Sequence, residues 1–130
     1  MSGAKKQGMV YVIDDDESIR KALKRLFRSV DLDVETFPSA EEFLSNPRQD
    51  QNACLLIDIR MPGLTGFDLQ ERLISRGIEI PVIVISASDD VQTREHAREL
   101  GAVVFFRKPV DDYALLDAIW WAISGGRKKS

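Results

Sequence analysis

The sequence lacks the features that define several protein classes. It has one cysteine and one histidine in 130 residues, which excludes an internal disulfide and a cysteine–histidine metal site. No apolar run approaches the ~18 residues of a membrane span, and the opening MSGAKKQG has no apolar stretch like that of a secretory signal. Glycine-rich motifs of the Walker and GxGxxG types are also missing. The missing membrane span and secretory signal favour a cytoplasmic location.

The composition is that of a folded globular protein. Hydrophobic residues make up 44% of the chain and charged residues 30%, which excludes collagen-like and wholly disordered classes. A length of 130 residues fits a single domain. We expect this domain to cover 9–124, with a flexible tail over 1–8 and a flexible basic tail or truncated linker over 125–130.

The net charge of −3 hides an acidic body. Five of the 18 cations lie near the two ends, at Lys5, Lys6, Arg127, Lys128 and Lys129, so 13 cations face 21 acidic residues in between. An acidic body repels a phosphate backbone. Nucleic acid is therefore not expected as a direct partner, and the lack of a long apolar run argues against a membrane.

Short apolar runs alternate with stretches of helical periodicity along the whole chain. The runs are 9–13, 34–37, 53–57, 82–85 and 103–106; the helical stretches are about 17–29, one opening at Ser39, then 66–76, 89–100 and 111–124. Most of the runs are continuously apolar, as in strands covered on both faces. This alternation predicts an α/β fold, with a five-stranded parallel sheet and helices on both faces. Glycines at 77 and 101 are placed for left-handed helix ends.

Polar side chains gather at the carboxyl ends of the predicted strands. Asp14, Asp15 and Asp16 follow the first strand, Asp58 follows the third, Ser86 the fourth, and Lys108 comes two residues after the last. Ligands bind at this edge of open α/β sheets. Strand order 2-1-3-4-5 brings Asp14 and Asp15 against Asp58, whereas a dinucleotide-type order would separate them. We therefore predict the first order.

Three carboxylates in one crevice need a positive counterpart. At ~4 Å and an effective dielectric of ~20, each close pair costs about 4 kcal/mol. Lys108 supplies one charge, and Mg²⁺ fits the remaining oxygen ligands. With Ser86 as a hydroxyl donor, the set is typical of phosphoryl transfer, in which Asp58 is the nucleophile. Asp16, Glu17 and Asp89 are better explained as helix-capping or solvated residues.

Four segments together carry a family resemblance. VYVIDDDESIR, LLIDIRMPGLTGFDL, IPVIVISA and FFRKP, in this order and spacing, resemble the receiver domain of bacterial two-component response regulators. The resemblance covers about 9–123 and is nearest to receivers of transcriptional regulators with a helix-turn-helix output. It implies a flavodoxin-like receiver fold and phosphorelay signal transduction.

The resemblance implies a role for each site residue. Asp58 becomes the phosphoacceptor that takes a phosphoryl group from a sensor histidine kinase. Asp14 and Asp15, with the backbone carbonyl of Arg60, join Asp58 as Mg²⁺ ligands, and Ser86 and Lys108 contact the phosphoryl group. Self-phosphorylation and autodephosphorylation are implied, with no separate substrate turnover.

It also implies a switch and an interaction surface. Ser86 and Phe105 match the switch positions, and Pro109 matches a proline that follows a cis peptide bond. The face formed by the fourth helix, fifth strand and fifth helix is the implied homodimer surface. Val110 departs from the phenylalanine that is frequent there, which reduces apolar contact near the last helix.

Alternatives remain open at this point. The chain could be a receiver-like interaction module that is not phosphorylated. A dehalogenase-type phosphatase would need a substrate-covering cap, for which 130 residues leave no room, and a flavodoxin-like FMN carrier would need a hydroxyl-rich loop where this chain has three carboxylates. His96 is expected to be solvated on its helix and Cys54 to be packed as a thiol. On the last helix, Leu116, Ile119, Trp120 and Ile123 form one predicted core stripe, and Trp121 is predicted to be an exposed contact residue.

Overall fold

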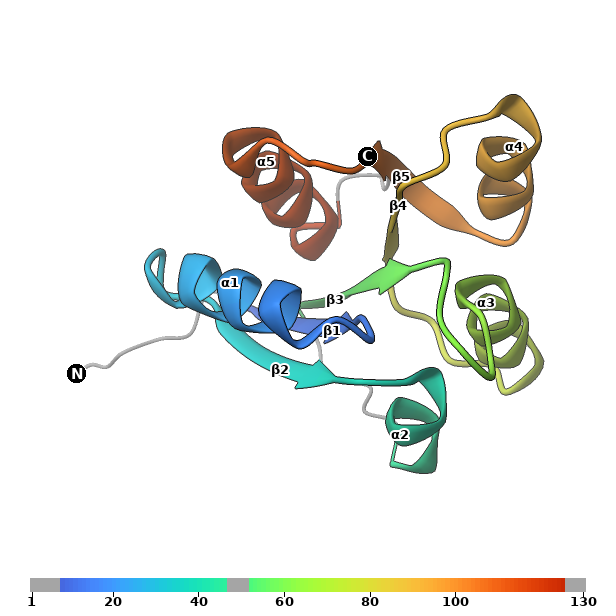
Figure 1. Cartoon of the computed structure of the whole chain (residues 1–130). Coiled ribbons are helices and arrows are strands. Elements are labelled where there is room, and N and C mark those ends of the chain that lie inside the picture. The colour runs from blue at the N-terminus through green and yellow to red at the C-terminus, as the bar shows by residue number, and fades with distance from the viewer. Residues whose placement is uncertain (1–7, 47–51, 126–130) are drawn as a thin grey trace.

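The computed structural model describes residues 8–46 and 52–125. Strands and helices alternate throughout (Figure 1). The elements are β1 (Met9–Ile13), α1 (Glu17–Arg28), β2 (Asp33–Phe37), α2 (Ala40–Ser45), β3 (Ala53–Asp58), α3 (Gly66–Ser75), β4 (Val82–Ser86), α4 (Val91–Glu99), β5 (Ala102–Arg107) and α5 (Asp112–Ile123). Among the described residues, no helix has the length and apolar character needed to span a bilayer.

The strands form one parallel sheet in the order β2-β1-β3-β4-β5. Helices α1 and α5 cover one face, and α2, α3 and α4 cover the other (Figure 1). This is the predicted fold and the predicted strand order. The order places β1 directly beside β3, with Ile13 paired to Ile57, so the next residues, Asp14 and Asp58, lie at the same level of the sheet.

The core consists of two layers, one on each side of the sheet. Along β1, Val10 and Val12 pack toward α1 and α5, while Tyr11 and Ile13 pack toward α2, α3 and α4. Both faces are apolar because both are covered by helices, which is why strands β1, β3 and β4 read as continuous apolar runs. The edge strands β2 and β5 are half-buried.

Side-chain caps fix where most helices begin. Asp16 caps α1, as predicted, and Ser39 caps α2 by accepting a hydrogen bond from the Glu42 N–H. The expected start of the fourth helix at Asp89 is wrong by two residues. Asp90 is the N-cap of α4, because its carboxylate accepts the Thr93 N–H at 2.7 Å. Asp89 instead pairs with Arg94 at 2.7 Å.

The glycines at two helix ends adopt the predicted left-handed backbone. Gly77 has φ +68° and Gly101 has φ +103°. Both end a helix that would otherwise run into the following strand. At the N-terminal side, Gly8 is buried and its carbonyl accepts the Asp33 N–H, so the ordered fold includes this residue. The rest of the two predicted tails lies outside the described residues, apart from Gly125.

The buried face of α5 is rotated relative to the predicted stripe. Leu115, Ile119 and Ala122 are buried, whereas Leu116 and Trp120 are half-buried against the same cluster. The predicted stripe therefore covers only one edge of the buried face, because α5 is rotated about its axis so that Leu115 faces the sheet. Trp121 is 42% exposed, as predicted.

Candidate functional site

Three carboxylates meet at the carboxyl edge of the sheet. Asp14 follows β1, Asp15 comes next in the loop, and Asp58 ends β3. One ligand oxygen from each lies within 4.8 Å of those from the other two. Asp14 and Asp58 are buried and Asp15 is exposed, so the cluster is open to solvent on one side. The predicted acidic cluster is present, and it forms because β1 and β3 are neighbours.

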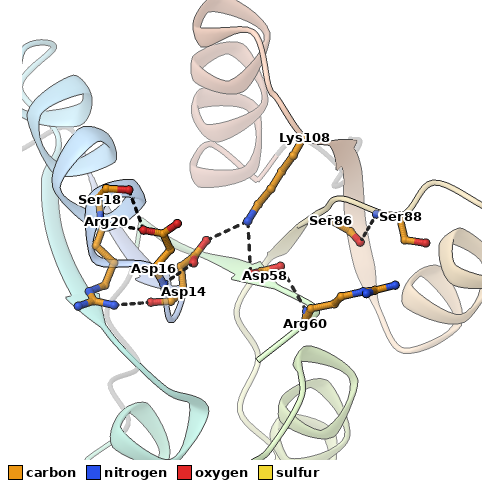
Figure 2. A network of polar contacts seen from close by, with 9 residues as sticks. All are labelled: Asp14, Asp16, Ser18, Arg20, Asp58, Arg60, Ser86, Ser88 and Lys108. Atoms are coloured by element: carbon orange, nitrogen blue, oxygen red, sulfur yellow. Dashed lines mark hydrogen bonds and ion pairs between the residues drawn. The ribbon is translucent and has the colours of Figure 1, made fainter. Parts of the chain in front are cut away.

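Lys108 lies between the two buried carboxylates (Figure 2). Its Nζ is 3.3 Å from Asp14 Oδ2 and 3.3 Å from Asp58 Oδ2. The backbone N–H of Lys108 donates to the Ser86 carbonyl at 2.9 Å, and the Lys108–Pro109 peptide bond is cis, as the resemblance implied. The lysine therefore supplies the positive charge that the sequence required.

Burial and like charge act on Asp58 in the same direction. Burial raises the pKa of its carboxyl, the nearby Asp14 raises it further, and Lys108 opposes both. For Lys108, burial disfavours the charged ammonium, but Asp14 and Asp58 outweigh burial and raise its pKa. Without a further cation, Asp58 is thus less acidic than an ordinary aspartate.

Asp14 is held by four hydrogen-bonding groups. Its N–H donates to the Phe37 carbonyl at 3.1 Å, and its Oδ1 accepts the Asp16 N–H at 2.9 Å. Lys108 contacts the other carboxylate oxygen, and Arg20 Nη1 donates to the backbone carbonyl at 2.7 Å (Figure 2). The sequence reasoning missed Arg20. The available signal was a cation in the first turn of α1, where the helix dipole disfavours positive charge.

Asp16 belongs to the helix rather than to the acidic cluster. Its Oδ1 accepts the Ser18 N–H at 2.9 Å and the Ser18 hydroxyl at 2.7 Å. These bonds lower the pKa of the Asp16 carboxyl. The structure therefore separates Asp16 from Asp14 and Asp15, as the sequence predicted.

The Ser86 hydroxyl is oriented toward its own loop. Ser86 is buried at the end of β4, and its Oγ accepts the Ser88 N–H at 3.0 Å. Arg60, on the other side of Asp58, donates its backbone N–H to Asp58 Oδ1 at 3.3 Å. Figure 2 shows the Arg60 side chain directed away from Asp58, toward α4. Arg60 thus contacts Asp58 through its backbone N–H, and the Ser86 hydroxyl is bonded within its own loop.

Phe105 lies away from the acidic cluster, on β5. It is half-buried against the core on the α4 side, and the Arg94 guanidinium carbon lies 5.5 Å from its ring centroid. This distance is within cation–π range. Phe105 is thus held between α4 and the sheet in this structure.

Val110 borders a cavity next to Lys108. The cavity has a volume of about 490 Å³ and lies between α1, the end of β4 and the start of α5. Its lining includes Ile19, Leu23, Pro109 and Leu115. A small side chain at 110 leaves this space open, in keeping with the reduced contact expected from the sequence.

Two residues outside the site match their predictions. Cys54 is buried within β3, and burial raises the pKa of its thiol to about 12. His96 is exposed on α4, where its ring stacks edge-on against Phe67 with centroids 4.4 Å apart. Neither belongs to the acidic cluster.

The donor set fits a hard divalent cation. It consists of carboxylate oxygens, which Mg²⁺ prefers, and the exposed side at Asp15 leaves room for water or phosphate oxygens. The repulsion that raises the pKa of Asp58 would be relieved by such an ion. The described residues are thus chemically suited to Mg²⁺.

Comparison with known proteins decides the family. A family model described as response regulator receiver domain matches 10–120. This chain is a receiver domain of the response regulator family. The model match includes the whole acidic cluster, Ser86 and Lys108.

Relatives of this receiver domain are regulators of greater length. Nodulation protein W of Bradyrhizobium diazoefficiens is 42% identical over 126 residues, 97% of this chain and 56% of that protein. Response regulator protein TodT of Pseudomonas putida is 41% identical over 111 residues, 85% of this chain and 49% of that protein. Other relatives are named transcriptional regulatory proteins. The receiver domain spans about half the length of the curated relatives it matches.

A solved structure shares both fold and sequence with this receiver domain. Full-length FixJ from B. japonicum superposes with a TM-score of 0.86 at 35% identity, over 95% of this chain and 61% of that chain. The shared fold and sequence agree with the strand order and the family assignment.

Proposed function

We propose that this receiver domain accepts a phosphoryl group on Asp58 from a phosphohistidine of a sensor histidine kinase, with Mg²⁺, and thereby switches an output surface. One observation carries the proposal. The Lys108 ammonium spans two buried carboxylates, 3.3 Å from each, within an acidic cluster suited to a cation. A cluster that only capped helices would not need a lysine from the loop after β5, which lies three positions from β1 and two from β3 in the sheet.

Asp58 supplies the attacking oxygen. Its carboxylate forms the new P–O bond while the P–N bond of the donor breaks, and the electron pair of that bond stays on the imidazole nitrogen. Lys108 opposes the rise in the Asp58 pKa and so favours the ionised nucleophile. The same ammonium stabilises charge on the phosphoryl oxygens.

The Mg²⁺ ligands in this proposal are Asp14, Asp15, Asp58 and the backbone carbonyl of Arg60. The bound ion would neutralise the carboxylates and the incoming phosphoryl oxygens. Asp14 contributes from a rigid position because all its polar groups have partners, whereas Asp15 lies on the exposed side. The cluster thus offers one fixed and one adjustable acid.

Ser86 and Phe105 form the proposed switch. The Ser86 hydroxyl now accepts the Ser88 N–H, so reaching a phosphoryl oxygen requires its loop to move inward. That movement would open space for Phe105, whose ring is held by Arg94 on α4. Phosphorylation would then reshape the α4–β5–α5 face.

Intact mass spectrometry tests the acceptor. Wild type incubated with acetyl phosphate and Mg²⁺ should gain roughly 80 Da, the mass of one phosphoryl group. Asp58→Asn should gain nothing. Asp16→Asn is the matched control, because asparagine also caps helices well and the loop loses the same charge. An equal mass gain in Asp58→Asn would show that another residue is the acceptor. No mass gain in wild type would favour an interaction module that is not phosphorylated.

The partners follow from the same proposal. A homodimer through the α4–β5–α5 face would explain the exposure of Trp121 on α5. Sedimentation of wild type and Trp121→Ala, with and without phosphodonor, tests it. Identical mass distributions would remove Trp121 from the interface. We place the domain in the cytoplasm, together with its kinase partner.

A further inference from the structure

Arg20 occupies an unfavourable position for a cation. It lies at the end of the first turn of α1, where its backbone N–H donates to the carbonyl of the N-cap residue Asp16. The partial positive charge of a helix dipole is located at this end, so a guanidinium here weakens the helix. Of the other basic residues of α1, Lys21 and Lys24 lie further along the helix, and Arg25 and Arg28 lie in its last turn, where the dipole favours them. Helix stability therefore does not account for Arg20.

The guanidinium instead folds back onto the acidic loop. Arg20 is half-buried, and its Nη1 donates to the Asp14 carbonyl at 2.7 Å (Figure 2). A bond this short from a charged donor is a strong hydrogen bond. The carbonyl belongs to the peptide group that joins Asp14 to Asp15. Arg20 thus fixes the peptide plane immediately before Asp15.

Asp15 depends on that peptide for its orientation. Its side chain is exposed, and within the described ranges none of the side chains forms a hydrogen bond or ion pair with its carboxylate. Asp14, by contrast, is held through its carboxylate by the Asp16 N–H and by Lys108. The position from which the adjustable Asp15 side chain leaves the backbone is therefore set by the peptide that Arg20 holds.

We infer that Arg20 is a positioning residue for the cation site, acting through the Asp14–Asp15 peptide on the ligand Asp15. This inference rests on the proposed function, in which Mg²⁺ occupies the cluster. Two effects of Arg20 on Mg²⁺ binding have opposite signs. Its charge repels the ion, and its hydrogen bond orients a ligand. Orientation dominates in our inference, because the bond fixes a ligand at short range while solvent screens the charge at the open side.

The test is a Mg²⁺ titration followed by amide NMR shifts of the acidic loop, at constant ionic strength, with no phosphodonor. Arg20→Met should weaken Mg²⁺ binding about tenfold, the lower end of the range for residues that orient metal ligands. Arg20→Lys should recover part of that loss, because an ammonium can donate to the same carbonyl. Arg25→Met, which removes an exposed cation from the other end of α1, is the control and should bind as wild type does.

The outcomes separate the possible roles. Tighter binding in Arg20→Met than in Arg25→Met would show that only the charge matters and would overturn the inference. Equal binding constants, with a lower unfolding free energy of metal-free Arg20→Met, would mean a structural role and would also overturn it. Failure of wild type and Arg25→Met to saturate with Mg²⁺ would remove the cation site itself, and with it the proposed function. Saturation with equal constants in all four proteins removes this inference alone.

Discussion

The Nζ of Lys108 and the Oδ2 of Asp14 lie 3.3 Å apart, although the two residues are separated by 94 positions in the sequence. The contact links the loop after β5 to the end of the central strand β1. Asp14 is 1% exposed at its side chain and Lys108 is 23% exposed. An ion pair with one buried partner resists rearrangement more than a surface pair does, so it gives the site a fixed reference point.

Loss of the ammonium should destabilise the metal-free domain. Lys108→Met leaves Asp14 and Asp58 without their shared partner, and we expect a loss of about 2 kcal/mol, below the value for fully buried pairs because Lys108 is partly exposed. Urea unfolding measures the change. Lys21→Met, which breaks an exposed pair with Glu17, should lose less than about 0.5 kcal/mol. Equal losses in the two variants would mean that the buried ion pair contributes no more to the unfolding free energy than the exposed pair does.

Neutralising Asp58 should stabilise the metal-free domain. Burial and Asp14 raise the pKa of the Asp58 carboxyl, so its ionised form opposes folding. Asp58→Asn should gain about 0.5–2 kcal/mol at neutral pH. The gain should shrink as the pH falls through the raised pKa, because wild type then protonates Asp58 itself. Thermal unfolding from pH 7 to pH 4 checks this, and a gain independent of pH would contradict the assignment.

At high pH, Lys108 determines how the unfolding free energy of the domain changes with pH. Its pKa is raised above the ordinary value of 10.5, so the folded state holds the proton more tightly than the unfolded state. The stability contributed is fully present below about pH 10.5 and is lost as the pH rises through the folded-state pKa. The difference in unfolding free energy between wild type and Lys108→Met should therefore narrow above pH 10.5. A constant difference would show that the lysine pKa is not raised by folding.

Gly63 and Glu41 should be energetically coupled. Gly63 has φ +77°, and a Cβ there would lie 2.7 Å from Glu41 Oε2, the oxygen that accepts the Leu64 N–H. Gly63→Ala should cost about 1–2 kcal/mol from backbone strain, plus the displacement of Glu41. In a Glu41→Ala background only the strain should remain, so the cost should be smaller.

Gly77 provides the control for the comparison of Gly63→Ala with and without Glu41. Its φ of +68° is similar, but a Cβ added at this position would meet no other atom within 4 Å. Gly77→Ala should therefore cost the same with or without Glu41, as measured by urea unfolding. If Gly63→Ala also costs the same in both backgrounds, the carboxylate and the loop are not coupled.

Gln70 should hold the end of α4 against α3. Its Nε2 donates to the carbonyls of Ala97 and Leu100 at 3.0 and 3.3 Å, while its buried Oε1 has no partner among the described residues. Gln70→Met keeps the volume and removes both donors, so we expect a loss of about 1 kcal/mol and faster amide hydrogen exchange in α4. The exposed Gln92→Met on α4 is the control. Unchanged amide hydrogen exchange of α4 in Gln70→Met would show that Gln70 does not hold α4 against α3.

The sheet and the acidic cluster could be predicted because they depend on patterns along the chain. Apolar runs end in polar residues at Asp14, Asp58 and Ser86, and parallel strands place these ends at one edge. The strand order is predictable because only the order 2-1-3-4-5 brings Asp14 and Asp58 together. Each of these steps uses backbone topology and side-chain chemistry, which the sequence carries directly.

The parts that the sequence could not give depend on side-chain direction. Nothing in the pattern says that Arg20 turns back to the Asp14 carbonyl or that the Ser86 hydroxyl accepts from Ser88. Asp89 and Asp90 are equivalent as sequence signals, and only the reach of the Asp90 carboxylate to Thr93 decides the cap. Leu115 and Leu116 differ by about 100° around α5, and the roll of the helix against the sheet determines which is buried.

The buried thiol of Cys54 can report on the opening of β3. The sulfur lies four residues before Asp58 on the same strand, and burial holds its pKa at about 12, so the reactive thiolate does not form in the folded domain. Alkylating reagents would reach it only when the strand opens. The alkylation rate of the single cysteine therefore measures how often β3, the strand that bears Asp58, opens. A ligand bound at the end of this strand should lower that rate, and no probe has to be introduced to measure it.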